Sequence, residues 1–330
     1  MLFRSGFRFE ETSTDARDGA LELKGGVRIR STPDRASTDA VDAGWLRLEL
    51  DRSASQGVGA IKARGTPNAT PNATAAPGSD GASAPTAAFE SRRWANVARD
   101  GDPRLLRLEG QSIDFDLRTQ EGLVNSRGKL LVHVPAATSD ASASAANAPA
   151  APSDATIGGR PLGVGVVGGG LFTWDRQLVL HRAATTAGGP PVFTVRMEDG
   201  VRVIHADTSE MSLSAAWLEA DFERLASDEP ASADAERGVD LTGTGKLLRV
   251  RAGSGVSLGG TGRIVIVTED FTIECDGFSY DAAAQRATLT AVPGSSVAVV
   301  PAKEPVRRTA TSIDWDLAKG TLRIHDARGG

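Results

Sequence analysis

Two pairs of aspartates have a spacing that could bring two carboxylates together. Asp114 and Asp116, like Asp314 and Asp316, stand two residues apart, which places both side chains of a pair on the same face of a β-strand. Paired carboxylates serve as acid and base in glycosidases. Neither pair leads into Asp-Thr-Gly or Asp-Ser-Gly, and both occupy equivalent positions of a repeated pattern. The sequence therefore favours a turn or surface role for them over catalysis.

Other candidate chemistry is weaker. Residues 163–168 read Gly-Val-Gly-Val-Val-Gly, but a dinucleotide fingerprint needs a strand before it and a helix after it. Here a low-complexity segment precedes the glycines and another strand follows. The four histidines, at positions 133, 181, 205 and 325, lack metal-ligand spacing, and Cys275 is the single cysteine, so no disulfide or cysteine cage forms within one chain. We predict no catalytic residue, cofactor or metal.

The charge balance argues against nucleic acid as a partner. The chain has 42 acidic and 37 basic residues, a formal charge of −5, and no block of lysine or arginine. No apolar run approaches the roughly 20 residues of a membrane-spanning helix, and no signal-type stretch follows the first residues. We expect no transmembrane segment. If the protein works outside the cytoplasm, we expect the sequence to be a fragment or to be exported by another route.

Three segments rich in Ala, Ser, Pro, Thr, Gly and Asp lack apolar periodicity, at about 53–88, 135–160 and 226–238. They cannot bury enough apolar surface to offset the entropy of ordering, so we predict disordered segments there. The chain then divides into an N-terminal β half, 1–134, with the insertion at 53–88, a linker at 135–160, and a C-terminal β half, 161–330, with the insertion at 226–238.

The remaining sequence alternates apolar and polar residues over short stretches, which predicts an all-β protein. Examples are Leu46-x-Leu48-x-Leu50, Leu130-x-Val132-x-Val134, Phe193-x-Val195-x-Met197 and Phe271-x-Ile273-x-Cys275. One segment is ambiguous: apolar residues within 211–225 also fit one face of a helix. We favour a strand there because its surroundings repeat as strands.

A hairpin pattern recurs three times along the chain. Each copy has an apolar-x-aromatic-Asp strand end, a few polar or small residues, and a small residue before the next strand. The copies are 113–116 leading to 122–124, 278–281 leading to 287–289, and 313–316 leading to 320–322. We expect the aromatic ring to anchor the strand, the aspartate to bind turn amides, and the small residue to adopt an unusual backbone conformation. Repetition indicates stacked equivalent units.

Segments 218–222, 248–258 and 275–281 resemble the OstA-like family, which includes periplasmic lipopolysaccharide-bridge components and the N-terminal domain of the outer-membrane assembly protein. The likeness covers 195–330 well, 100–134 partly and 15–50 weakly. It implies an elongated, open, twisted β-jellyroll of two antiparallel layers built from repeated hairpins. It also implies a periplasmic or envelope location, lipopolysaccharide or another amphipathic lipid held by its acyl chains, and edge-strand pairing with similar domains.

The residues expected to line the lipid groove are the inward alternates of the three hairpins: Ile113, Phe115, Phe278, Tyr280, Ile313 and Trp315. Inward residues of this kind are most often ordinary core or turn anchors with no ligand role. Two other hypotheses therefore stay open. One is a structural β module or β-solenoid of the envelope that binds protein or polysaccharide without lipid transport. The other is a carbohydrate-active enzyme on a β-solenoid, which would need a cleft lined by carboxylates.

Overall fold

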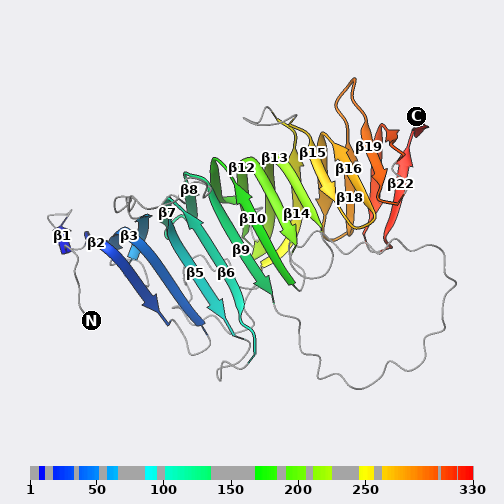
Figure 1. Ribbon diagram of the computed structural model, residues 1–330. Coiled ribbons are helices and arrows are strands. Elements are labelled where there is room, and N and C mark those ends of the chain that lie inside the picture. Colours follow the sequence, from blue (N-terminus) through cyan, green and yellow to red (C-terminus); the bar gives the residue numbers. More distant parts are fainter. Residues whose placement is uncertain are drawn as a thin grey trace, which may run out of the picture.

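The apolar alternation of the sequence forms strands throughout the described part of the chain (Figure 1). The computed structural model describes residues 7–11, 18–32, 37–51, 58–65, 86–94, 101–134, 168–183, 191–205, 211–224, 245–255, 262–303, 306–317 and 319–329. Within these ranges the regular structure is entirely antiparallel β-sheet. The strands stack side by side along one long axis (Figure 1). The all-β prediction is confirmed.

The N-terminal part consists of twelve strands. They are β1 (Phe7–Glu11), β2 (Asp18–Ser31), β3 (Ser37–Asp51), β4 (Val58–Arg64), β5 (Ala87–Arg93), β6 (Arg104–Gly110), β7 (Ser112–Asp116), β8 (Glu121–Val124), β9 (Gly128–Val134), β10 (Gly168–Trp174), β11 (Gln177–Ala183) and β12 (Val192–His205).

Ten of these strands close on themselves. β3 pairs with β4 through one half and with β5 through the other, so two arms of sheet start from it. One arm runs β4, β7, β8, β11 and the second runs β5, β6, β9, β10. Both arms end on β12. The pairing is thus that of a closed ten-stranded barrel, which differs from the open jellyroll expected for this part of the chain.

The C-terminal part consists of eleven strands, of which β13 pairs with β12 and the others form two further arms. They are β13 (Ser212–Arg224), β14 (Gly245–Gly253), β15 (Ile264–Val267), β16 (Phe271–Cys275), β17 (Gly277–Asp281), β18 (Arg286–Thr290), β19 (Val297–Pro301), β20 (Arg308–Ala310), β21 (Ser312–Asp316), β22 (Thr321–His325) and β23 (Arg328–Gly329).

β13 is paired with β12 along its length and starts both C-terminal arms. One arm runs β14, β17, β18, β21, β22 and the other runs β15, β16, β19, β20, β23. Among the described strands, β22 pairs with β21 alone and β23 with β20 alone. The two arms are therefore joined at β13 and carry no described pairing to each other at their far ends.

A local bend lets one long strand serve both arms. In β12 the register shifts between Glu198 and Val201, and Asp199 and Gly200 between them have φ of 61° and 56°. Before this bulge β12 pairs with β11, and after it with β10. The turn between those two strands is bound to the bulge, since the Asp175 N–H donates to the Asp199 carbonyl at 2.8 Å. Bulges bend strands and raise their twist, which explains how β12 joins the two arms.

The apolar faces of the two arms form one continuous interior. A single cluster of contacting buried side chains extends from Val27 to Leu317. In the N-terminal part, Phe89 of β5 approaches Phe115 of β7 with ring centroids 6.1 Å apart, although these strands belong to opposite arms. The interior is therefore a packed layer between two arms of sheet, as in other sheet-on-sheet cores.

The structure resolves two sequence-based expectations. The ambiguous segment 211–225 is strand β13, as favoured. The predicted insertion at 53–88 is wrong in part, because residues 58–64 form β4 between β3 and β7. On β4, Ile61 and Ala63 face inward, opposite Phe115 and Ile113 of β7, and a register shift lies beside them. The alternation of large apolar residues that marks a strand is therefore absent from this stretch.

The other low-complexity predictions, 135–160 and 226–238, lie outside the described residues. On either side of the first, β9 and β10 pair with each other over seven residue pairs. The two halves proposed from sequence, 1–134 and 161–330, therefore share main-chain hydrogen bonds. The closed barrel draws strands from both.

Candidate functional site

The six residues proposed to line a lipid groove all lie in the shared interior. Their exposed fractions lie between 0% and 9%. They come from β7, β17 and β21, the first strands of the three repeated hairpins. The structure thus places all six on the apolar inner face, as the alternation predicts. In this conformation they are packed as core residues.

The hairpin turns are bound by aspartate as the sequence predicts. Asp116, Asp281 and Asp316 each accept a hydrogen bond from the backbone N–H three residues further along the chain, at 3.2, 2.9 and 3.1 Å. Side-chain acceptors of this kind stabilise turns because they satisfy amides that no strand partner reaches. The prediction for the aspartates is confirmed.

The expected role of the small residues is correct at Gly320 and wrong in the other two turns. Positive φ angles of 60°, 50° and 63° occur at Gln120, Gln285 and Gly320, the fourth residue after each aspartate. Gly122 and Ala287, which were expected to supply this conformation, lie two residues later in regular strand. The length of the turn therefore decides which residue adopts the left-handed backbone conformation, and in two of the three turns that residue is a glutamine.

Gly122 is small for a packing reason. It pairs directly with Phe115 across the first hairpin, and a Cβ there would lie 2.4 Å from the phenyl ring. In the second hairpin Ala287 is opposite Tyr280 in the same way. A small residue opposite an aromatic one leaves room for the ring to lie over the neighbouring strand.

The aromatic residue of the third hairpin spans the two C-terminal arms. The Trp315 ring on β21 meets Phe271 of β16, which belongs to the other arm, at a centroid distance of 5.5 Å and an interplanar angle of 72°. Sequence reasoning identified the Phe271 strand but not this contact. Alternation assigns Phe271 an inward face and contains no information on which strand faces it.

The two aspartate pairs are engaged in ion pairs and turns. Asp114 binds Arg64 of β4 through both oxygens, at 2.7 and 3.1 Å, and Asp314 binds His325 of β22 at 2.9 Å. The hydrogen bond from His325 lowers the pKa of Asp314 below its usual value. Burial raises the pKa of Asp116, but the side chain and amide of Arg118 and the amide of Thr119 lower it overall. A general acid needs a raised pKa, so the lowered pKa values of Asp116 and Asp314 do not suit such a role.

The remaining candidate motifs are dispersed. Within the described residues, no group of three or more histidine, cysteine, aspartate or glutamate side chains is gathered for a metal ion. Residues 163–167 of the glycine-rich motif lie outside the described residues. Residues 255–259 read Gly-Val-Ser-Leu-Gly, which matches the Gly-x-Ser-x-Gly pattern, and 256–259 lie outside the described residues. A nucleophile elbow is followed by a helix, whereas the next described element along the chain is strand β15.

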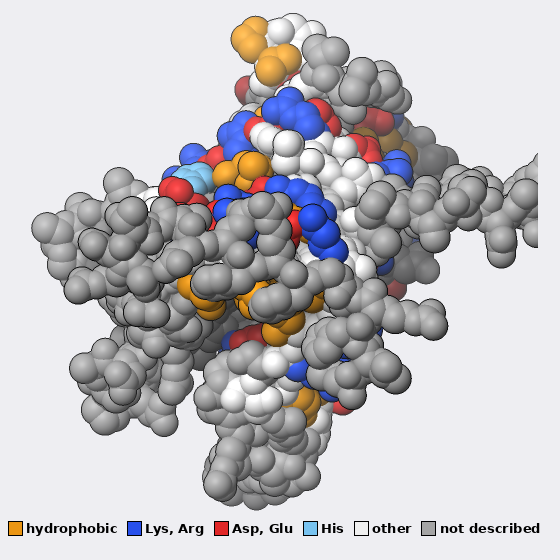
Figure 2. All heavy atoms as spheres, turned by 90° about the vertical axis from the view of Figure 1, so that its left-hand side faces the viewer, with side chains coloured by type: hydrophobic (Ala, Val, Ile, Leu, Met, Phe, Trp, Pro, Cys, Tyr) orange, Lys and Arg blue, Asp and Glu red, His pale blue; other side chains and the backbone are white. Residues whose placement is uncertain are grey.

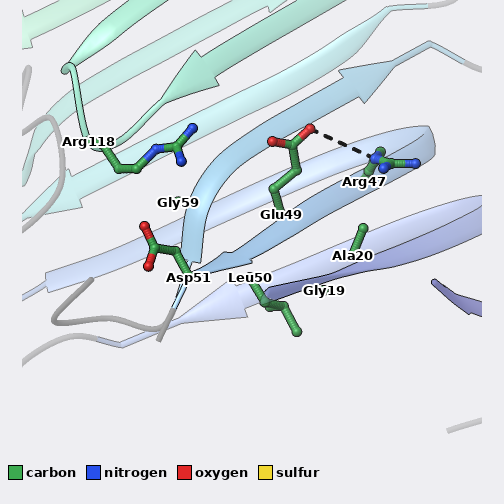
Figure 3. Close-up of a pocket in the computed structure, with 8 residues that line it drawn as sticks. All are labelled: Gly19, Ala20, Arg47, Glu49, Leu50, Asp51, Gly59 and Arg118. Atoms are coloured by element: carbon green, nitrogen blue, oxygen red, sulfur yellow. Dashed lines mark ion pairs between the residues drawn. The ribbon is translucent and has the colours of Figure 1, made fainter. Parts of the chain in front are cut away.

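A polar recess near the N-terminal end offers little chemistry. It has a volume of about 340 Å³ and lies between β2, β3, β4 and the first repeated turn (Figure 3). Its eight described lining residues are Gly19, Ala20, Arg47, Glu49, Leu50, Asp51, Gly59 and Arg118. Arg118 is bound to Asp116 at 3.2 Å, and Arg47 lies 3.9 Å from Glu49. Two arginines and two carboxylates balance each other in this lining, which contains no histidine, cysteine, serine or threonine.

The outer faces of the sheet have paired charges. Across β12, β13 and β14, Glu219 lies between Arg196 and Arg251 and binds both. In the adjacent row Asp221 binds Arg249 at 2.8 Å. Lys and Arg side chains also lie among Asp and Glu side chains on the end of the molecule that faces the viewer in Figure 2. The carboxylate side chains of Glu219 and Asp221 are only 14% and 10% exposed and are neutralised by arginines, so these residues form no single-sign patch for a polyanion.

Cys275 is buried and should be chemically inert in the folded protein. Its side chain is 0% exposed, and burial raises the pKa of its thiol to about 12. At pH 8 the native thiolate fraction should be on the order of a thousandfold below that of a free cysteine. We expect a thiol reagent to label the urea-unfolded chain rapidly and the native chain at least about a hundredfold more slowly. Equal rates would show that the reagent reaches Cys275 in the native state.

Comparisons with known proteins give no relative. No protein-family model matches the chain, and no curated protein or solved structure shows a significant similarity to it. In the part of the chain that the structure describes, no helix is long and apolar enough to cross a membrane. The class that the fold defines is thus an all-β protein with two arms of antiparallel sheet around an apolar interior.

Proposed function

We propose that this chain is a non-enzymatic envelope module of the lipopolysaccharide-transport type. In this proposal the C-terminal arms act as an open β-jellyroll that receives acyl chains of an amphipathic lipid between them. The observation that carries the proposal is an apolar interior between two arms whose last strands, β22 and β23, have no described pairing to each other. Burial of an acyl chain there gains roughly 0.8 kcal/mol for each methylene.

The proposal requires the arms to separate, because the interior is packed. Ile313 and Trp315 are 0% and 1% exposed, whereas Leu322 and Ile324 on the terminal strand β22 are half-buried against the core. Among the described strands β22 pairs with β21 alone. The interior is therefore held by the fewest strand pairings at this end. Strands with one neighbour open at lower free energy than central ones, which supports entry between β22 and β23.

The terminal strands also support association with similar domains. β1 pairs with β2 alone among the described strands, and β22 and β23 likewise have one neighbour each. Unpaired main-chain groups of an edge strand are a template for another β-strand. Sedimentation at rising protein concentration should therefore reveal particles larger than one chain. A single monomeric species at every concentration would contradict this half of the proposal.

A lysine at the proposed entrance tests lipid uptake. Leu322→Lys places a charge on the inner face of β22, whereas Thr321→Lys places the same charge on its outer face, opposite Asp316. With a fluorescent lipid A probe we expect saturable uptake by the unmodified protein and the Thr321→Lys control. The Leu322→Lys protein should bind about tenfold more weakly, because its ammonium group must stay hydrated beside the acyl chain.

One observation favours a second candidate, an envelope scaffold that binds protein or polysaccharide without lipid transport. The contact between Phe271 and Trp315 joins the arms in the way a closed core does. If the folded unmodified protein takes up no lipid A probe, the lipid proposal is wrong and the scaffold is favoured. Mass spectrometry of molecules that co-purify from an envelope extract gives an independent readout.

A further inference from the structure

The indole N–H of Trp315 is a buried donor without an acceptor. The side chain is 1% exposed, and its Nε1 forms no hydrogen bond in the structure. The indole N–H groups of two other tryptophans differ: Trp174 donates to the Ser126 carbonyl at 2.8 Å, and Trp45 donates to Glu22 at 2.8 Å. Buried donors are almost always paired, so an exception needs an explanation such as an absent ligand or water.

The surroundings of Trp315 determine what kind of acceptor is suitable. Ala287 and Leu322 are its cross-strand neighbours, and the Phe271 ring meets it from the other arm. These groups are apolar, and a facing ring provides at most a weak contact to an N–H. A charged acceptor would lose its hydration here at a high cost. The suitable partner is therefore a neutral oxygen with hydrocarbon on both sides.

Trp315 also lies close to the proposed entrance. Its strand, β21, is the next strand inward from β22, whose inward residues Leu322 and Ile324 are half-buried. An acyl chain that entered between β22 and β23 would pass these two residues before it reached the indole. The unpaired donor lies one strand inward from this entrance, within reach of the carbonyl group of a chain whose hydrocarbon tail extends further between the arms.

We propose that Trp315 is the polar anchor of the interior, with its Nε1–H donating to the carbonyl oxygen of an ester or amide that joins an acyl chain to the rest of an amphiphile. This inference rests on the proposed lipid-binding function and assigns its specificity. It separates acylated amphiphiles, which carry such a carbonyl, from alkyl ethers of equal length, which lack it.

Two lysophosphatidylcholines form a matched pair of probes, one with an ester-linked acyl chain and one with an ether-linked alkyl chain of equal length. A neutral hydrogen bond predicts that the ester binds about 2- to 12-fold more tightly than the ether. The indole ¹⁵N–¹H resonance of Trp315, assigned by its loss in Trp315→Phe, should move downfield with the ester and much less with the ether.

Two variants isolate the donor. Trp315→Phe removes Nε1 and retains an aromatic ring, so its ester-to-ether affinity ratio should fall to about 1. Trp174→Phe removes an indole that is already paired, within the closed barrel, and should keep the ratio of the unmodified protein. The ratio compares two ligands on one variant, and it is therefore insensitive to a general loss of stability. Thermal unfolding of each variant verifies that it is folded.

The outcomes separate this inference from the function on which it rests. If neither probe binds the folded protein, the lipid-binding function fails and the anchor fails with it. If both bind equally, and Trp315→Phe changes nothing, lipid binding stands and the anchor is wrong. A water molecule that stays in contact with the Trp315 N–H after the ester has bound, seen as a persistent cross-relaxation signal, would also overturn the anchor.

Discussion

Trp315→Ala should lower the free energy of unfolding by about 3–5 kcal/mol, the range for truncation of a buried tryptophan. The indole is 1% exposed and packs on Phe271 of the opposite arm, so its removal leaves a cavity between two arms that no described strand joins at that end. No hydrogen bond is lost, because Nε1 has no partner. The measurement is urea unfolding followed by circular dichroism, with the midpoint and slope compared with those of the unmodified protein.

Val292→Ala is the control for this prediction. Val292 is 53% exposed, and a surface truncation of this kind should change the free energy of unfolding by less than about 0.5 kcal/mol. If the two variants unfold at the same urea concentration, the C-terminal interior is not the packed core that the structure contains. If the free energies of unfolding of the two variants differ by several kcal/mol, a lipid that enters between the arms has to replace the packing contacts of Trp315.

The second large effect is expected at Gly128 in the closed barrel. A Cβ at this position would lie 2.4 Å from the Trp174 indole and 2.5 Å from the Glu109 carbonyl oxygen. The indole is held by its hydrogen bond to Ser126, and the carbonyl belongs to the paired strand β6, so neither can move away easily. Gly128→Ala should therefore destabilise the protein by roughly 2–3 kcal/mol, the cost of overpacking a rigid site.

Gly277→Ala is the matched control, a glycine-to-alanine change in another strand. A Cβ there would meet the Thr290 hydroxyl at 2.6 Å, but Thr290 is exposed and its side chain can rotate. Its cost should stay below about 1 kcal/mol. Thermal unfolding of both variants under one condition gives the comparison. Equal midpoints would show that the Trp174 indole and the β6 backbone yield as easily as a surface hydroxyl.

Much of the fold could be predicted because its signals are local. Alternation over five or six residues assigns strands and their inner faces, and the aspartate at the end of a strand specifies the turn amides that it binds. The three hairpins and their six inward residues were therefore predictable. Local signals failed at residues 58–64, where Ile61 is the one large side chain opposite the inward residues of β7, and at Gly122, which is small because Phe115 lies against it.

The sequence by itself determined that the described chain is all-β and which side chains of each hairpin face inward, because a strand's period of two depends only on neighbouring residues. Only the tertiary structure decided that the two N-terminal arms both pair with β12 and that the two C-terminal arms end on β22 and β23 without a described pairing between them. Those pairings depend on bulges such as Asp199-Gly200 and on contacts between strands far apart in sequence. The unpaired Trp315 donor is likewise a tertiary property, because the groups that surround the indole come from strands far apart in the sequence.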